Sequence, residues 1–370
     1  MIFKTEDLKT VCGKILLAVD NSELSPLTET LELLVENKKL YLNVTNREYF
    51  AQVCLAKDFE EDFHVTVNAL LFLKLINQLT SENVELEVFD NYLKINANGS
   101  YKLPLIFDGD KLLELPKIEL NNVVNDFEID SKILNNIAYY NSKELLKGHA
   151  TKPVQNLYYV DDKGAITFRS GACVTSFSLE SPIALLLNDR LVKLFKLFKD
   201  EQVHFTLSIE DLAEDITQTK VKFETDSIIL TAILPCDKEL INSVPVKAIR
   251  GRAEENYPYS VNVNKEEFLQ AINRLLLFFS GFGGKKVLKT YGVLSFKNNE
   301  FVIYDTNKEN YEKITLNNSQ DIDYEFVADL VDIKTTLECC DENYINLNFG
   351  APQAFTIRRN NVCNIIPVCK

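Results

Sequence analysis

The stretch LELLVENKKLYLNVTNREYFAQVCL spans residues 31–55 and alternates apolar with polar side chains. Two later segments have the same order of an apolar run, a short polar turn and a second apolar run: NLYYVDDKGAITFRSGACVTSFSL at 156–179 and YGVLSFKNNEFVIYDTNKENYEKITL at 291–316. Alternation of this kind is typical of half-buried strands joined by hairpin turns. A strand motif that occurs three times therefore decides the fold.

Predicted helices flank each copy of this strand motif. Those before it lie at 6–20, 130–143 and 265–279, and those after it at 67–79, 188–200 and 327–340. A further set of strands follows each second helix, at 84–106, 203–234 and 344–368. The order helix, strands, helix, strands thus recurs at a spacing of about 120–140 residues, which is near the size of one domain.

The predicted fold class is α+β, with three repeated domains at 1–122, 123–250 and 251–370. The segments 116–130 and 245–260 mark the boundaries, and the second, rich in charge and proline, is interpreted as a linker. Three unrelated α+β domains are the alternative.

Composition limits the classes of function. The chain has 370 residues, a formal net charge of -14, 46% hydrophobic and 25% charged residues, as in ordinary soluble globular proteins. Neither a signal peptide nor a membrane-spanning apolar run is found, so we expect a cytoplasmic protein without membrane contact. The eight cysteines form no C-x-x-C pair and the three histidines lie far apart, so we expect no metal and no cofactor. The acidic total still permits a local basic surface.

The segment NDRLVKLFKLFKD at 188–200 is such a surface. On a helix, one arc of roughly 100° collects large apolar side chains. These are Leu187, Leu191, Leu194, Phe195 and Phe198. The opposite side offers only positive charge, from Arg190, Lys193, Lys196 and Lys199. Taken alone, a solvated face is the favoured interpretation.

No enzymatic motif stands out, and the chain is predicted not to be an enzyme. The sequence lacks a nucleophile elbow, a metal-ligand spacing and the Rossmann glycine pattern. The segment SGFGGKKVLK at 280–289 fails the P-loop pattern because Lys286 stands where Ser or Thr is required, and it is interpreted as a basic loop. An enzyme remains the main alternative class, and an interaction protein built from the same repeats is the second.

Over its whole length the chain resembles the bacterial-type DNA polymerase sliding clamp, the beta subunit of the replicative polymerase. The threefold repeat, the total length, the ending NIIPVCK and the segment KVLKTYGVLSFKNNEFVIYDTN at 286–307, with Gly292-Val293, carry this resemblance. The many Asn and Lys residues suggest a divergent member, encoded by a phage or a low-GC genome. A eukaryotic-type trimeric clamp is disfavoured because its protomers have two such domains.

The resemblance implies a head-to-tail homodimer whose ring encircles duplex DNA without sequence preference. Such a ring is a processivity factor that tethers DNA polymerase and the clamp loader through short peptide motifs. A clamp-like ring serving phage transcription is the alternative within the same fold.

Three sets of residues follow from the resemblance. The DNA-binding candidates are Lys9, Lys14, Lys74, Lys143, Lys147, Arg190, Lys193, Lys196, Lys199, Arg274, Lys285, Lys286 and Lys334. The partner-peptide pocket is expected at Gly171, Ala172, Cys173, Val174, Val244, Pro245, Ile366, Pro367 and Val368. The dimer interface is expected at Phe107, Leu277, Phe278 and Phe279. The family often has His-Arg where Ala172-Cys173 stands, which leaves the peptide preference open.

Overall fold

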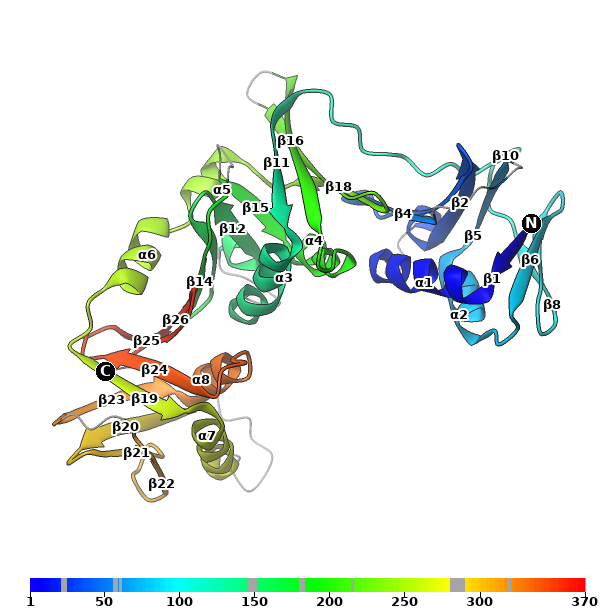
Figure 1. The fold of residues 1–370 in the computed structure, drawn as a ribbon. Helices are drawn as coiled ribbons and strands as arrows, with labels where there is room; N and C mark the ends of the chain where they lie inside the picture. The colour runs from blue at the N-terminus through cyan, green and yellow to red at the C-terminus, as the bar shows by residue number, and fades with distance from the viewer. Residues whose placement is uncertain are drawn as a thin grey trace. The chain divides into compact units, whose positions relative to one another are not determined.

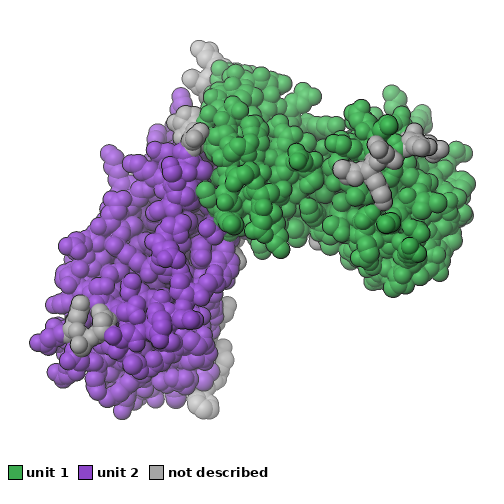
Figure 2. Space-filling model, viewed as in Figure 1, with its two compact units in different colours: residues 1–135, 190–236 green, residues 136–189, 237–370 purple. Residues whose placement is uncertain are grey.

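The computed structural model describes residues 1–20, 25–55, 59, 62–145, 152–179, 184–213, 216–279, 290–317 and 321–369. The chain divides into two compact units, one of residues 1–135 and 190–236, the other of residues 136–189 and 237–370 (Figures 1 and 2). The helices α3 (Ser131–Tyr140) and α4 (Asp189–Leu194) are each shared between the two units. Within the described ranges, no helix has the length and apolar character needed to cross a bilayer.

The first unit contains a four-stranded and an eight-stranded antiparallel sheet (Figure 1). The smaller sheet has the order β1-β6-β7-β8, formed by Ile2–Lys4, Asn83–Val88, Tyr92–Asn96 and Ser100–Pro104. The larger has the order β11-β16-β17-β18-β4-β3-β2-β5, formed by Val123–Asp130, Gln202–Ala213, Ile216–Glu224, Ile228–Leu234, Tyr49–Leu55, Lys39–Thr45, Thr30–Glu36 and Phe63–Asn68. A short hairpin joins β9 (Phe107–Asp108) to β10 (Lys111–Leu112), and α1 (Thr5–Ile15) packs against α2 (Ala69–Gln78).

The second unit repeats this combination of sheets. Its eight-stranded sheet has the order β15-β12-β13-β14-β26-β25-β24-β19, formed by Leu185–Asn188, Leu157–Asp161, Gly164–Phe168, Ala172–Ser176, Val362–Pro367, Ala354–Arg359, Tyr344–Phe349 and Tyr259–Asn264. Its four-stranded sheet has the order β22-β21-β20-β23, formed by Tyr311–Ile314, Glu300–Tyr304, Tyr291–Lys297 and Tyr324–Asp329. The helices are α5 (Lys238–Asn242), α6 (Val246–Glu254), α7 (Lys265–Phe279) and α8 (Leu330–Leu337).

All these sheets are built from two kinds of four-stranded half. One kind is a three-stranded meander whose first strand also pairs with a later strand: β2-β3-β4 with β5, β12-β13-β14 with β15, and β20-β21-β22 with β23. The other kind is a three-stranded meander whose first strand also pairs with an earlier strand: β6-β7-β8 with β1, β16-β17-β18 with β11, and β24-β25-β26 with β19. Each eight-stranded sheet joins one half of each kind, at the pairs β4–β18 and β14–β26. The predicted α+β class and its threefold pattern of elements are therefore present.

Local chemistry explains the elements that the sequence indicated. The turns at Asn37-Lys38 and Asn298-Asn299 have positive φ angles of 51°, 65°, 54° and 62°, which suit two-residue hairpins. The side chain of Asn68 accepts a hydrogen bond from the N–H of Leu71, 3.0 Å away, and so caps α2. Asp329 caps α8 in the same way, through the N–H of Val331 at 2.9 Å.

Two local expectations are corrected. The basic helix expected at 188–200 is shorter, because α4 ends at Leu194, a 3₁₀ turn spans Phe195–Leu197 and Phe198 has extended backbone. The expected linker at 245–260 is partly helical, since VKAIRGRAE forms α6. The Ala, Arg, Lys and Glu residues of that segment favour a helix, and the charge and proline around it hid this from the sequence analysis.

Candidate functional sites

An apolar pocket of about 320 Å³ lies in the second unit beside the junction of β14 and β26. The β13–β14 turn forms one wall, α6 forms another, and β26 with the segment before β25 forms the third. The lining residues are Phe168, Arg169, Ser170, Gly171, Ala172, Pro245, Ala248, Ile249, Arg252, Gln353, Ala354, Ile365 and Pro367. Such a concave, mostly apolar surface with a few polar groups suits the side chains of a short peptide.

Strand alternation decides which predicted residues reach this pocket. Ala172 pairs with Ile365 across the junction and both line the pocket. The next pair, Cys173 and Asn364, is almost fully buried, and the carbonyl of Cys173 accepts a hydrogen bond from Asn141 Nδ2 at 3.2 Å. Adjacent strand residues point to opposite faces, so the four consecutive residues expected at 171–174 do not share one surface.

The structure places Gly171, Ala172, Pro245 and Pro367 in the lining. It places the other five expected residues elsewhere. Val174 lines a second cavity, Cys173, Val244 and Ile366 are buried, and Val368 packs against the hydrophobic core. The α6 residues Ala248, Ile249 and Arg252, which line the pocket, were missed because that segment was interpreted as a linker.

Gly171 permits the close approach of the two strands. A Cβ at this position would lie 2.4 Å from the backbone oxygen of Ile365 and 3.5 Å from Pro367 Cδ. A backbone oxygen cannot rotate away as a side chain can. The wall of the pocket therefore requires glycine here for packing.

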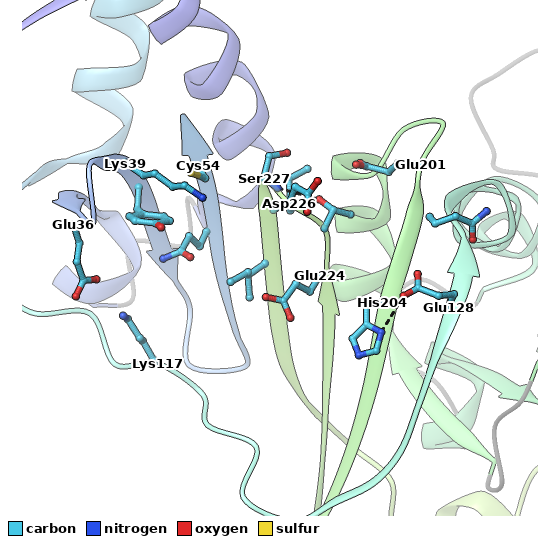
Figure 3. Close-up of a pocket in the computed structure, with 16 residues that line it drawn as sticks. Glu36, Lys39, Cys54, Lys117, Glu128, Glu201, His204, Glu224, Asp226 and Ser227 are labelled. Carbon is cyan, nitrogen blue, oxygen red and sulfur yellow. Dashed lines mark hydrogen bonds and ion pairs between the residues drawn. The ribbon is translucent and has the colours of Figure 1, made fainter. Parts of the chain in front are cut away.

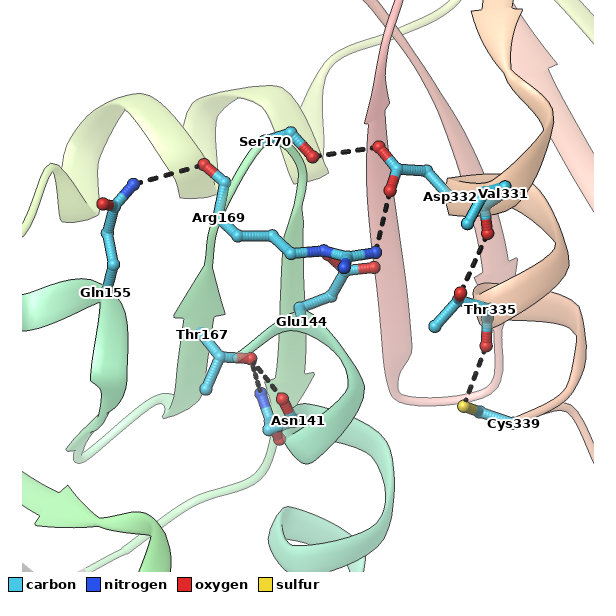
Figure 4. Close-up of polar contacts among 10 residues, drawn as sticks. All are labelled: Asn141, Glu144, Gln155, Thr167, Arg169, Ser170, Val331, Asp332, Thr335 and Cys339. Atoms are coloured by element: carbon cyan, nitrogen blue, oxygen red, sulfur yellow. Dashed lines mark hydrogen bonds and ion pairs between the residues drawn. The ribbon is translucent and has the colours of Figure 1, made fainter. Parts of the chain in front are cut away.

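Charged side chains fix the turn that forms the rim of the pocket, Arg169–Gly171 (Figure 4). Arg169 Nη2 lies 2.8 Å from Asp332 Oδ1 and its Nε lies 3.3 Å from Glu144 Oε2. The Ser170 hydroxyl donates to Asp332 Oδ2 at 2.9 Å. Burial raises the pKa of Glu144 above its ordinary value, although the guanidinium of Arg169 opposes this.

A smaller cavity of about 250 Å³ is lined by other residues of α6 and by Val174 and Cys363 of the same strand junction. Lys163, Arg250 and Arg358 contribute positive charge to it. Arg250 holds Asp161 with two hydrogen bonds of 2.8 and 2.5 Å. Burial alone would raise the pKa of Asp161, but these bonds and the N–H of Lys163 outweigh it and hold the pKa below its ordinary value.

The helix α4 and the turn after it have the two faces that the sequence predicted. Arg190, Lys193, Lys196 and Lys199 are exposed. The apolar residues of the segment, Leu191, Leu194, Phe195 and Phe198, are at most 2% exposed. Arg190 forms an ion pair of 2.9 Å with Asp20.

The remaining DNA-binding candidates lie on several elements. Lys9 and Lys14 are on α1, Lys74 is on α2, and Lys143 is in the 3₁₀ turn Asn141–Glu144. Arg274 on α7 is held by Glu312 through hydrogen bonds of 2.8 and 2.7 Å, and Lys334 on α8 lies 3.8 Å from Glu338. Lys147, Lys285 and Lys286 lie outside the described residues.

Three of the four residues expected at a dimer interface have exposed apolar side chains. Phe107 on β9 is 41% exposed, and Leu277 and Phe278 at the end of α7 are 70% and 64% exposed. Phe279 is half-buried and packs against the hydrophobic core of its unit.

A charged cavity of about 690 Å³ lies in the first unit at the β4–β18 junction (Figure 3). Its lining includes Glu36, Lys39, Lys117, Glu224 and His204. His204 Nδ1 lies 3.1 Å from Glu128 Oε1. Four of these residues come from four separate strands and Lys117 comes from the segment between β10 and β11, so local sequence patterns carry no signal for the cavity. Nowhere in the described part of the chain do three or more His, Cys, Asp or Glu side chains form a group suited to a metal ion.

Comparison with known proteins agrees with the fold described above. Residues 1–110 match the family model of the DNA polymerase III beta subunit, N-terminal domain. The DNA polymerase sliding clamp of Bacillus subtilis superposes with a TM-score of 0.78 at 17% identity, covering 100% of this chain and 98% of that chain. This chain has the sliding-clamp fold. The resemblance to bacterial-type clamps is thereby confirmed, for a divergent sequence.

Two further solved structures show the same likeness. The beta subunit from the DNA polymerase of Streptococcus pyogenes gives a TM-score of 0.80 at 12% identity, covering 100% of this chain and 99% of that chain. The Helicobacter pylori beta clamp bound to a DNA ligase peptide gives 0.74 at 17% identity, with the same coverages. No curated protein sequence matches the chain.

Proposed function

We propose that this protein is a sliding clamp, a non-enzymatic ring of two chains that encircles duplex DNA and tethers a DNA polymerase. The observation that carries this proposal is that two four-stranded sheets, β1-β6-β7-β8 and β22-β21-β20-β23, are not joined into an eight-stranded sheet among the described residues. Within one chain, β4 joins β18 and β14 joins β26. In the repeat, β22 is equivalent to β4 and β14, and β8 is equivalent to β18 and β26. Both β22 and β8 lie at the edges of their sheets.

Pairing β8 of one copy with β22 of a second would complete an equivalent eight-stranded sheet. Repeated in both directions, this head-to-tail contact closes a ring of two chains. It also covers two sheet edges that would otherwise invite aggregation. The exposed side chains of Phe107, Leu277 and Phe278 supply apolar surface for such an interface.

DNA would be held by weak contacts from lysine side chains. Lys196 and Lys199 are exposed and form no ion pair with the described residues. Lysine contacts to phosphates carry no sequence information and weaken as salt rises, so a ring can slide while topology keeps it on the DNA. The net charge of -14 would keep the DNA away from other surfaces of the protein.

Partners would dock in the apolar pocket between α6 and the β14–β26 junction. A Helicobacter pylori clamp of this fold binds a DNA ligase peptide, and a Pseudomonas aeruginosa clamp binds griselimycin. In this chain, Ala172, Ile249 and Ile365 would receive apolar anchors of a polymerase or clamp-loader peptide.

Topology provides the test. The full chain is incubated with a nicked circular plasmid, the salt is raised, and half of the sample is cut once with a restriction enzyme before gel filtration. Retention on the circle and loss from the linear DNA are expected. Equal retention on both would contradict encirclement and favour an interaction protein built from the same repeats.

A further inference from the structure

We propose that Asp332, in the first turn of α8, positions the rim of the partner pocket by holding Arg169 and Ser170 together. This inference rests on the proposed function of the pocket. It assigns a positioning role to a residue that does not line the pocket and that the sequence analysis did not single out.

The rim is a tight turn between two strands of the second unit. Its ends are tied by the hydrogen bond from the N–H of Arg169 to the carbonyl of Gly171, 2.9 Å long. Arg169, Ser170 and Gly171 all line the pocket. A displacement of this turn would therefore change the shape of the cavity directly.

Asp332 binds this turn with both of its carboxylate oxygens (Figure 4). Oδ1 accepts from Arg169 Nη2 at 2.8 Å, and Oδ2 accepts from the Ser170 hydroxyl at 2.9 Å. The side chains of Asp332 and Arg169 are 17% and 24% exposed, so water screens the pair only in part. Two charge-assisted contacts to adjacent residues fix both the position and the orientation of the turn.

The other contacts of the rim would not replace Asp332. Glu144 binds Arg169 Nε at 3.3 Å from the 3₁₀ turn below it, and Gln155 Nε2 donates to the Arg169 carbonyl at 3.4 Å. Neither contact reaches the Ser170 hydroxyl. Loss of the Asp332 carboxylate would leave Arg169 anchored at its Nε while Ser170 and the tip of the turn were released.

The helix α8 gives the rim a rigid support. Leu330, Ile333 and Leu337 are fully buried and anchor it in the core. Lys334, a DNA-binding candidate, lies two residues after Asp332, and two residues correspond to about 200° around a helix. Asp332 and Lys334 therefore lie on opposite sides of α8, and one helix joins the rim to a surface expected to face DNA.

The test replaces Asp332 with alanine in the full chain, with Glu338→Ala at the C-cap of the same helix as the matched control. Amide hydrogen exchange is followed for the rim residues 169–171, for β14 and for β26. Affinity is measured for a panel of synthetic octapeptides with leucine and phenylalanine at varied spacings. For Asp332→Ala we expect rim exchange about 3- to 30-fold faster and peptide binding weaker by a similar factor, with the two strands unchanged. Glu338→Ala should change neither.

Rim exchange at the wild-type rate in Asp332→Ala would overturn the proposal. If that variant is generally unstable, Ser170→Ala removes a single contact and should still loosen the tip of the turn. Unchanged exchange in Ser170→Ala would then overturn the proposal. Failure of the wild-type chain to bind any peptide of the panel would count against the proposed pocket function, while the exchange measurement would still decide whether Asp332 positions the rim.

Discussion

Replacing Gly171 with alanine should weaken the β14–β26 junction. The added Cβ would lie 2.4 Å from the Ile365 backbone oxygen, a distance at which one of the two strands must shift. Overpacking of this kind typically costs about 1–3 kcal/mol of the free energy of unfolding. Because the same strands form a wall of the pocket, peptide affinity should fall as well.

Gly251 provides a control with the opposite sign. It lies on α6 beside the same pocket, and a Cβ there would meet nothing within 4 Å. Alanine is favoured over glycine in a helix by about 0.8–1.0 kcal/mol, so Gly251→Ala should stabilise the chain. Urea unfolding of both variants and the wild type, followed by circular dichroism, measures the difference. A Gly171→Ala chain as stable as wild type would refute the close approach of the two strands.

Three further predictions concern charge and assembly. The double variant Lys196→Gln and Lys199→Gln should reduce the magnitude of the slope of log affinity for duplex DNA against log salt by about 1.8, since each lost phosphate contact removes about 0.9. Fluorescence anisotropy between 50 and 200 mM salt measures this slope. An unchanged slope would exclude both lysines from contact with DNA. Phe278→Glu should lower the mass measured by light scattering towards that of a single chain, while circular dichroism shows that the fold is kept, because Phe278 is 64% exposed in the isolated chain. An unaltered mass would show that Phe278 is not part of the interface. The pKa of Asp161 is lowered in the folded chain, so its contribution to stability is present above about pH 4 and is lost as the pH falls through the folded pKa. Asp161→Asn should therefore make the free energy of unfolding less dependent on pH in acid. The exposed neighbour Asp162 provides the control, and Asp162→Asn should show the wild-type dependence.

Local patterns in the sequence predicted the hairpins, the order of the elements and the two faces of α4. Hairpins at Asn37-Lys38 and Asn298-Asn299 combine strand alternation with residues that tolerate positive φ. The repeat order of helices and strands followed from the same periodicities. The buried and exposed faces of α4 followed from the spacing of its lysines and leucines.

Features that depend on distant residues could not be predicted in this way. The pairing of Ala172 with Ile365 joins strands 193 positions apart (365 − 172), and it decides which residues line the pocket. Glu312 binds the guanidinium of Arg274 from 38 residues away. The rim contact between Ser170 and Asp332 spans 162 residues. Side-chain partners of this kind are set by tertiary packing and leave no trace in local spacing.

Small-angle X-ray scattering of the full chain over a range of concentrations tests the central claim most directly, because it reports mass and internal shape together. The proposed ring predicts the mass of two 42.3 kDa chains and a pair-distance distribution of a hollow particle. A single-chain mass at every concentration, or a two-chain particle without a central hole, would contradict it.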